Sequence, residues 1–218
     1  MPSWTERAGR AAERYEDGAA RLPDDPDERQ RQLTRMANAA WAAGLSLLMS
    51  GDQDEGRAWL VCAAERYRES WALAPPDSWG RPIGAMKARL VAGDLEGAAR
   101  DAEWGLSANA ERSASPIGRY AAGLALLVLG RDERASPLAA RLRDRDDFPT
   151  AVADALVALA AGDANGYDAA IRGLLADFES RGEFLEDVPV ADTVLALEAL
   201  AEPRGIAVGP RSALLPPA

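Results

Sequence analysis

The chain has 218 residues, of which 48% are hydrophobic, and its 25 basic and 35 acidic residues give a formal net charge of −10. This composition excludes a mostly disordered chain, and the length is sufficient for one domain with a sizeable core. The acidic balance disfavours nucleic-acid binding and attachment to an anionic membrane, because both need a basic surface. A basic protein partner would suit it electrostatically.

Short glycine-containing turns recur along the chain and predict where one helix ends and the next begins. The clearest is the stretch 90–100, Leu-Val-Ala-Gly-Asp-Leu-Glu-Gly-Ala-Ala-Arg, which contains Gly93 and Asp94. Glycine adopts the left-handed conformation that closes a helix, and the aspartate that follows can cap the next one. The other turn glycines are Gly51, Gly130 and Gly162. We therefore expect a series of helical hairpins.

Apolar residues recur at helical spacing between these turns and predict about nine or ten helices. No stretch alternates as a strand does, so the expected fold class is all-α: a degenerate stack of antiparallel helical hairpins that forms an α-α superhelix. We expect a single helical-repeat domain over 1–205 and an extended tail over 206–218. The predicted helices span residues 3–22, 27–49, 52–73, 83–92, 95–106, 116–129, 131–143, 149–160, 164–179 and 188–201.

Some expectations concern single residues at the helix starts. Ser3 has a glutamate three residues later, which is the capping-box spacing, and Asp52 repeats that pattern at the third helix. Asp187 is expected to cap the last helix. Leu95 is assigned to the packing face of its helix. Trp79 lies in a predicted loop between two hairpins.

The residues that most catalytic sites need are scarce. The sequence has no histidine and one cysteine, Cys62, which removes His-based triads, His metal sites and internal disulfides. The first residues lack the apolar core of a signal peptide, and the most apolar run, 120–129, is too short to span a bilayer. We expect a cytoplasmic protein that is not an enzyme and uses no cofactor or metal.

Carboxylates cluster in connections, notably over 144–147 and 183–187. Helix starts attract acidic residues through the helix dipole, which accounts for most of them. Aspartate and glutamate alone can also supply the acid and base of a hydrolase. A carboxylate-dependent hydrolase or a small-ligand site among the tryptophans therefore stays open as an alternative function.

Two sets of residues are candidates for binding. Trp79 and Arg81 lie in the predicted loop, and both residue types are enriched at interaction hot spots. The alternative is a Trp79 that folds back over its own hairpin. The second set would line an inner groove and hold a carboxylate, unless these side chains only form a solvated face. It consists of Asn38, Lys87, Arg89 and Arg119.

Two segments resemble a tetratricopeptide repeat. The segment 88–98, Ala-x-x-x-Ala-Gly-Asp-Leu-Glu-Gly-Ala, resembles its helix-turn-helix, and the segment 64–75, Ala-x-x-Tyr-x-x-x-Trp-x-Leu-x-Pro, resembles a closing helix with its proline. The turn glycines also recur at roughly 30–45 residues, the period of helical-hairpin repeats. Tetratricopeptide proteins are mainly partner-binding scaffolds, so the resemblance implies a protein-binding role.

The last third of the chain resembles an immunity-protein family of bacterial toxin systems, the family numbered forty-nine. The resemblance rests on Ala-Leu-Ala-Ala-Gly-Asp at 158–163, Tyr-Asp-Ala-Ala at 167–170, Leu-Ala-Leu-Glu-Ala-Leu-Ala at 195–201, Arg-Gly-Ile-Ala-Val at 204–208 and Leu-Leu-Pro at 214–216. The link before residue 188 departs from the family, which usually carries aromatic residues there. The resemblance implies a protein that binds and neutralises a toxin.

The sequence thus favours a non-enzymatic protein–protein interaction module, a helical-repeat scaffold or adaptor. An immunity-type inhibitor is an alternative within the same architecture. The partner would be another protein, with a basic one favoured by the charge. Self-association is a further outcome, because the ends of a repeat stack can pair with a second copy.

Overall fold

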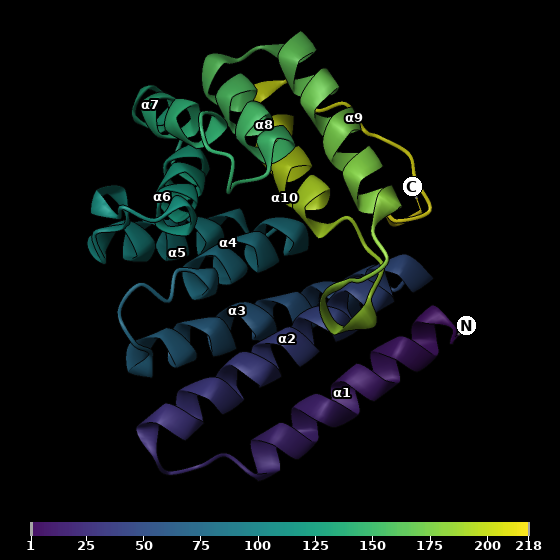
Figure 1. Cartoon of the computed structure of the whole chain (residues 1–218). Coiled ribbons are helices and arrows are strands. Elements are labelled where there is room, and N and C mark those ends of the chain that lie inside the picture. Colours follow the sequence, from purple (N-terminus) through teal and green to yellow (C-terminus); the bar gives the residue numbers. More distant parts are fainter. Residues whose placement is uncertain (1, 218) are drawn as a thin grey trace.

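The computed structural model describes residues 2–217 (Figure 1). Within these residues it contains ten α-helices, three short 3-10 helices and no strand, which confirms the all-α prediction. The 3-10 helices are η1 (Ala110–Arg112), η2 (Leu185–Asp187) and η3 (Glu202–Arg204). The α-helices are α1 (Trp4–Ala20), α2 (Pro26–Ser50), α3 (Gln53–Leu73), α4 (Gly80–Ala92), α5 (Leu95–Ser107), α6 (Pro116–Val128), α7 (Asp132–Arg143), α8 (Thr150–Ala161), α9 (Ala164–Ser180) and α10 (Asp192–Ala201).

The local chemistry of the turns agrees with the predicted hairpins. All four turn glycines have positive φ, between 65° and 91°. Asp94 accepts a hydrogen bond from the Gly97 amide at 2.8 Å, and the first helix carries the predicted capping box at Ser3. The predicted cap at Asp52 is wrong, because its side chain makes no capping hydrogen bond.

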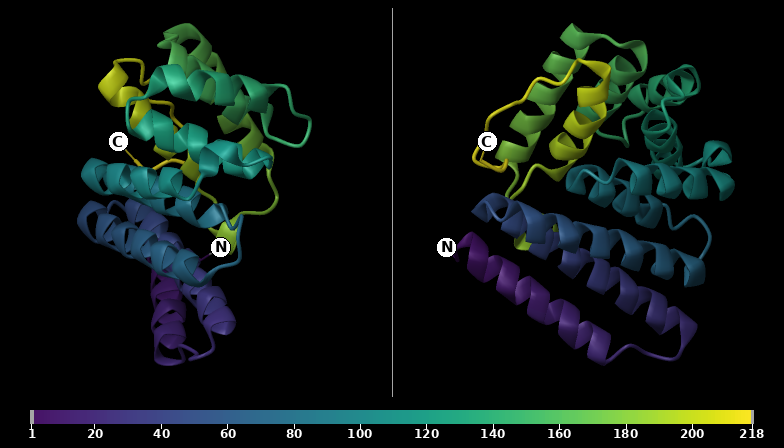
Figure 2. Two further views of the ribbon diagram at one scale, coloured as in Figure 1. Left: turned by 90° about the vertical axis from the view of Figure 1, so that its left-hand side faces the viewer. Right: turned by 180° about the vertical axis from the view of Figure 1, so that it is seen from behind.

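Consecutive helices pack against each other from α1 to α9, as the antiparallel hairpins require. Figure 2 shows α1, α2 and α3 layered at one end of the molecule, with α8, α9 and α10 at the other. The last helix does not extend the stack. It returns to pack on α4, in the middle of the chain, and also contacts α8 and α9. The inner side of the stack is thus filled by the chain's own α10.

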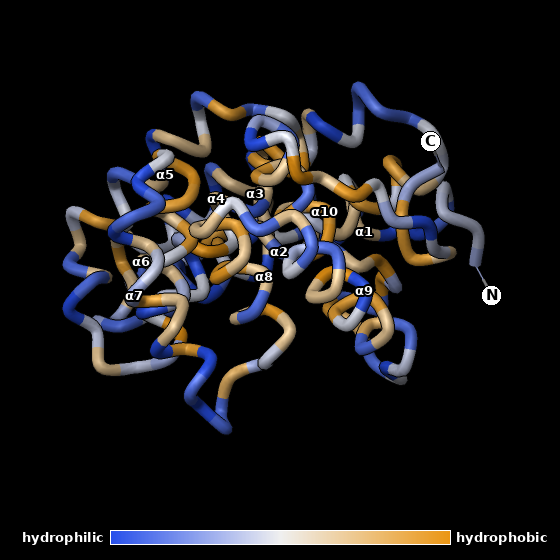
Figure 3. Tube along the Cα trace, turned by 90° about the horizontal axis from the view of Figure 1, so that it is seen from above, coloured by the Kyte–Doolittle hydropathy of each residue, from blue (hydrophilic) through white to orange (hydrophobic). Residues whose placement is uncertain are grey.

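The packing of α10 on α4 buries apolar residues of both helices in the hydrophobic core. Val194, Leu197 and Leu200 of α10 are buried in one cluster with Met86 of α4 and Leu156 of α8. The tube in Figure 3 shows hydrophobic segments toward the middle and hydrophilic residues in the peripheral connections. In the part of the chain that the structure describes, no helix has both the length and the apolar character needed to cross a membrane.

Two helix starts differ from the prediction. α4 begins at Gly80, so Trp79 is its N-cap residue and not part of a free loop. α10 begins at Asp192 and not at residue 188, because Val188 and Val190 are extended and buried against the helices of the N-terminal half. Asp187 precedes this extended stretch, so its assignment as the cap of the last helix is wrong.

The C-terminal tail is extended after Gly205 and packs on the helices. The backbone amides of Val208 and Gly209 donate hydrogen bonds to Glu198 of α10, at 3.1 and 2.7 Å. The Ala191 amide donates to the Leu214 carbonyl at 2.9 Å, and the next residue, Leu215, is buried. Glu198 therefore anchors the tail to the last helix.

Helices α2 and α3 cross at a pair of glycines. A Cβ at Gly44 would lie 2.9 Å from the Gly56 carbonyl oxygen and 2.7 Å from Leu60 Cγ. Gly44→Ala is therefore expected to lower the free energy of unfolding by about 1–3 kcal/mol through overpacking. Urea unfolding followed by circular dichroism measures this change.

Gly123 provides the matched control for that substitution. It is buried in α6, and a Cβ there would meet no neighbour within 4 Å. Gly123→Ala is expected to raise the free energy of unfolding by about 0.5–1 kcal/mol, since alanine restricts the unfolded backbone and suits a helix better. Equal effects of the two alanines would contradict the close crossing of α2 and α3.

Candidate functional site

The groove hypothesis places Lys87 and Asn38 on an inner surface that holds a carboxylate, and in the structure Lys87 contacts the chain's own α10. Lys87 Nζ donates to Asp192 Oδ2 at 2.7 Å and to Thr193 Oγ1 at 2.9 Å, and it lies 5.6 Å from the centroid of the Trp41 ring. The carboxylate that Lys87 holds is therefore supplied by the chain itself. The ion pair joins α4 to the first turn of α10.

Asn38 contacts a buried phenol. Tyr67 of α3 donates its hydroxyl hydrogen to Asn38 Oδ1 at 2.7 Å. Burial raises the pKa of Tyr67 well above its ordinary value, and the carboxylates of Asp192 and Glu186 raise it further. Asp192 thus pairs with Lys87 directly and raises the pKa of Tyr67, the residue that Asn38 binds.

Arg89 faces a separate network between α3, α4 and α5. Its guanidinium contacts Asp94 at 2.6 Å and Asp101 at 3.0 Å, and Arg68 contacts the other Asp101 oxygen at 2.9 Å. Asp101 is fully buried. Burial raises the pKa of Asp101, and the two guanidiniums offset only part of that effect. The network links three helices, and Arg89 does not face the inner surface of Lys87.

Trp79 and Arg81 are turned into the molecule. Trp79 is 5% exposed, donates from Nε1 to Asp77 Oδ1 at 3.0 Å and packs 5.2 Å from the Trp71 ring. Arg81 donates to Ser70 Oγ at 2.8 Å and to the side chain of Gln30, and burial lowers its pKa. Trp79 thus folds back over its own hairpin, the second of the two arrangements considered. A partner cannot contact it without rearrangement of the fold.

Arg119 lies apart from the other candidates, half-buried in the first turn of α6. The Arg145 guanidinium holds the pKa of Asp147 below its usual range, and the charge of Arg119 lowers that pKa by a smaller amount. Arg119 therefore faces the connection between α7 and α8. The structure does not place it with Lys87 and Asn38.

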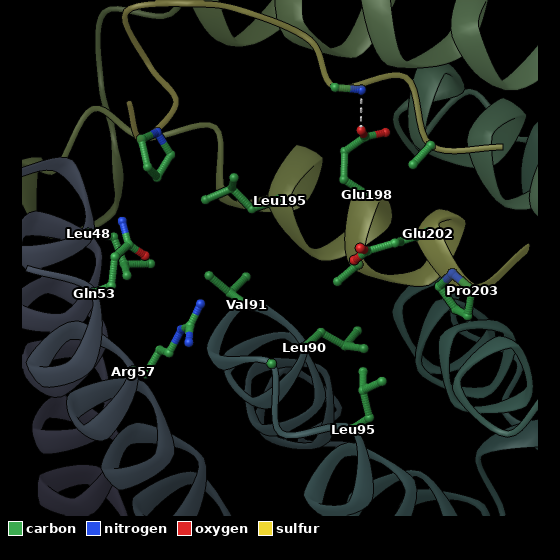
Figure 4. Close-up of a pocket in the computed structure, with 15 residues that line it drawn as sticks. Leu48, Gln53, Arg57, Leu90, Val91, Leu95, Leu195, Glu198, Glu202 and Pro203 are labelled. Atoms are coloured by element: carbon green, nitrogen blue, oxygen red, sulfur yellow. Dashed lines mark hydrogen bonds between the residues drawn. The ribbon is translucent and has the colours of Figure 1, made fainter. Parts of the chain in front are cut away.

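A surface groove of about 740 Å³ lies between the ends of several helices and the C-terminal tail. Figure 4 shows its two facing walls, one from α10 and η3 and one from α4 and the start of α5. Helices α2 and α3 close one end, and the tail covers part of the far side. The labelled lining residues are Leu48, Gln53, Arg57, Leu90, Val91, Leu95, Leu195, Glu198, Glu202 and Pro203.

We call this depression the tail groove. Its walls are mostly aliphatic, and Leu95 at its edge is 52% exposed. The prediction that Leu95 packs in the core is therefore wrong, because it occupies the first position of α5 and projects beyond the hairpin contact. Glu198 also lines the groove, but its carboxylate accepts hydrogen bonds from Tyr167 at 2.8 Å and from two tail amides.

The sequence analysis did not find the tail groove. An aliphatic residue directly after a capping aspartate is its only local sign, and the opposite wall comes from residues about a hundred positions away in the chain. Cys62, the single thiol, is half-buried and donates to the Tyr15 hydroxyl at 3.2 Å. Among residues 2–217, no three histidine, cysteine, aspartate or glutamate side chains gather into a metal-binding group.

The comparisons with known proteins add no relative. No protein-family model matches the sequence, and no similar protein was found among the curated proteins or the solved structures.

Proposed function

We propose that the chain is a non-enzymatic protein-binding module that docks a partner segment in the tail groove. The single observation that carries this proposal is an open depression of about 740 Å³ with aliphatic walls and an exposed leucine at its rim. Apolar grooves of this kind commonly take the hydrophobic face of a partner's helix or extended segment. Contiguous exposed apolar surface with a polar rim commonly marks an interaction site.

The polar residues of the tail groove support the same function. Arg57 and Glu202 are exposed and carry opposite charges at different parts of its rim. Charged rim groups around an apolar centre set the orientation of a bound segment more than its affinity. Glu198 is engaged by Tyr167 and the tail, so the two groove carboxylates do not form a free acid and base pair. The groove is therefore better suited to recognition than to hydrolysis.

The proposal predicts a selective effect of one leucine. Tagged wild-type protein passed through a lysate of its own source should retain a stoichiometric partner, and Leu95→Asp should lose it. Leu95 is largely exposed, so the substitution places a charge in the groove without disturbing the core. Ile117→Asp is the matched control, because Ile117 of α6 is 46% exposed and does not line the tail groove. A partner that binds wild type and both variants alike, or no partner at all, would contradict the proposal.

The second candidate is an immunity-type inhibitor, one specific form of such a module. The segments that carry the immunity resemblance contact one another in the fold: Tyr167 of α9 bonds Glu198 of α10, and Leu215 of the tail is buried. Arg204, in the helix exit that carries part of that resemblance, reaches Asp132 at 2.6 Å. These contacts support the proposal that the segments carrying the immunity resemblance form one packed unit. Co-expression with a toxin encoded beside the gene tests it: cells expressing wild type should survive.

The remaining details of the proposal follow the tetratricopeptide resemblance. Sequential helical hairpins support a tetratricopeptide-like scaffold, in which α10 then closes the inner face. We propose a cytoplasmic protein whose partner is a protein and not a nucleic acid or a membrane, in accord with the net charge of −10. A second copy of the chain in the tail groove would appear as a homodimer that Leu95→Asp dissociates.

A further inference from the structure

The connection between α9 and α10 crosses to the N-terminal helices. In Figure 1 this segment, which contains η2, lies against α2 near α1, and the contacts between η2 and α2 agree. Val188 and Val190 are buried in the cluster that contains Trp41 and Leu45 of α2. Leu185, by contrast, is 56% exposed. The segment is therefore anchored at its C-terminal end, and its acidic part lies at the surface.

Arginines of α1 contact this acidic part of the segment. Arg7, Arg14 and Arg21 are spaced by seven residues, so the first two share one face of α1 and Arg21, its C-cap residue, follows at the end of the helix. We call these three residues the arginine stripe. Arg7 donates to the Asp187 carbonyl, and Arg14 pairs with Glu186 at 3.0 Å. The first two members of the stripe thus hold a segment of the chain itself. The third lies beyond that segment.

The stripe continues into a depression of about 290 Å³ between α1 and α2, which we call the arginine groove. Met36 and Ala39 form part of its lining and are both nearly fully buried, and Gly18 allows the two helices to approach closely. Its lining contains three arginines and two carboxylates. One of these carboxylates is Glu186 of the segment between α9 and α10. Its lining residues are Arg14, Asp17, Gly18, Arg21, Gln32, Arg35, Met36, Ala39 and Glu186.

We propose that the arginine groove binds an acidic segment of a partner protein. The Glu186 carboxylate of its own segment already pairs with Arg14, which shows the kind of group that this face accepts. Arg21 and Arg35 extend the same surface past the point that Glu186 reaches. Arg21 forms an exposed ion pair with Asp17, and Arg35 donates to Gln32, so both remain at the surface where a ligand can compete for them. The three arginines outnumber the two carboxylates of the lining, in a chain with a net charge of −10, so the partner segment here is acidic even though the whole chain would favour a basic one.

The acidic part of the segment between α9 and α10 is weakly bound, so a competing ligand can displace it. Glu186 and Asp187 have φ values of 56° and 58°, a left-handed conformation that is strained for residues with side chains. The Arg14–Glu186 pair is substantially exposed, with 49% and 25% of the two side chains accessible. Exposed ion pairs contribute little to stability. A partner carboxylate can therefore take Arg14 as well while Val188 and Val190 stay anchored.

The arginine groove is distinct from the tail groove. Met36 lines the first and Leu48 the second, and twelve residues of α2 separate them, which is about 18 Å along a helix. The two sites share no lining residue. The inference therefore does not rest on the proposed function, and Leu95→Asp should leave the arginine groove unchanged.

Fluorescence anisotropy with the full-length protein tests the inference. The probe is a labelled peptide, Ala-Glu-Leu-Glu-Glu-Ala-Glu-Leu, and its partner probe has glutamine in place of every glutamate. The acidic peptide should bind, and the glutamine peptide should not. Binding should weaken at least about tenfold when the salt rises from about 50 to 500 mM, because screening weakens exposed charge pairs.

Variants locate the binding. Arg21→Ala combined with Arg35→Ala should weaken the acidic peptide at least about tenfold, and Glu186→Gln should tighten it about threefold by freeing Arg14. The matched control is Arg100→Ala combined with Arg172→Ala, two exposed arginines in similar helical ion pairs elsewhere. This control should bind as wild type does.

Several results would overturn the inference. They are the absence of binding by the acidic peptide, equal binding of the glutamine peptide, and unchanged affinity in the Arg21 and Arg35 double variant. Displacement of the peptide by an equal concentration of inorganic phosphate would show a general anion site and not a site for an acidic protein segment. Far-ultraviolet circular dichroism of each variant separates lost binding from lost folding.

Discussion

Asp101→Ala is expected to lower the free energy of unfolding by about 3–5 kcal/mol. The substitution removes the carboxylate that Arg89 and Arg68 share, at 3.0 and 2.9 Å. Arg89 is itself nearly fully buried, so its charge would remain in the interior with only Asp94 as a partner. Since small domains are stable by about 5–15 kcal/mol, the loss would be a large fraction of the total.

Urea unfolding followed by circular dichroism measures this effect. The control is Asp168→Ala, which breaks the exposed pair with Arg172 on α9 and should leave the unfolding midpoint unchanged within error. Asp101→Leu combined with Arg89→Met removes both buried charges and should cost less than Asp101→Ala alone, because the charges that lose a partner, Arg68 and Asp94, are accessible to solvent, with 40% and 29% of their side chains exposed. A double variant that loses more than Asp101→Ala would contradict the account.

The second large effect is a sharp loss of stability at alkaline pH. The chain has four tyrosines, and the pKa of each is raised in the folded protein. Burial is the first cause in every case. It raises the pKa of Tyr15 to about 12 and those of Tyr67, Tyr120 and Tyr167 further. Tyr167 is raised in addition by its hydrogen bond to Glu198.

The sign of the effect follows from proton binding. In the unfolded chain a tyrosine ionises near pH 10. Above that pH the unfolded state has released protons that the folded state still holds, so the free energy of unfolding falls as pH rises. The stability contribution is fully present below pH 10 and is lost as the pH rises above 10, up to about pH 12 for Tyr15 and beyond it for the other three tyrosines. With four such groups, the slope reaches as much as about 5 kcal/mol per pH unit.

Ultraviolet absorbance of tyrosinate checks this prediction directly. The folded protein should show almost no tyrosinate at pH 10 to 11, and all four tyrosines should ionise together when circular dichroism reports unfolding. Tyr120→Phe should reduce the slope of stability against pH by about one proton equivalent. Ionisation of two or more tyrosines near pH 10 while the helices remain intact would contradict it.

The sequence by itself determined the hairpin turns between helices, for a local physical reason. A glycine with positive φ followed by a capping aspartate acts within one turn of the chain, so Gly93 with Asp94 and Gly162 with Asp163 form the predicted hairpin turns. Helical spacing of apolar residues likewise determined the all-α class and the antiparallel order of the helices. These features depend only on neighbours in the chain.

Only the tertiary structure decided which surface each candidate residue faces. Lys87 carries the right charge for a carboxylate, but the carboxylate comes from Asp192, which lies 105 residues away. The burial of Trp79 against Trp71 and the exposure of Leu95 likewise depend on how whole helices meet. Side-chain chemistry and local spacing do not encode such distant pairings. The return of α10 to α4 therefore places the chain's own helix against Lys87, and the tail groove and the arginine groove lie elsewhere on the surface.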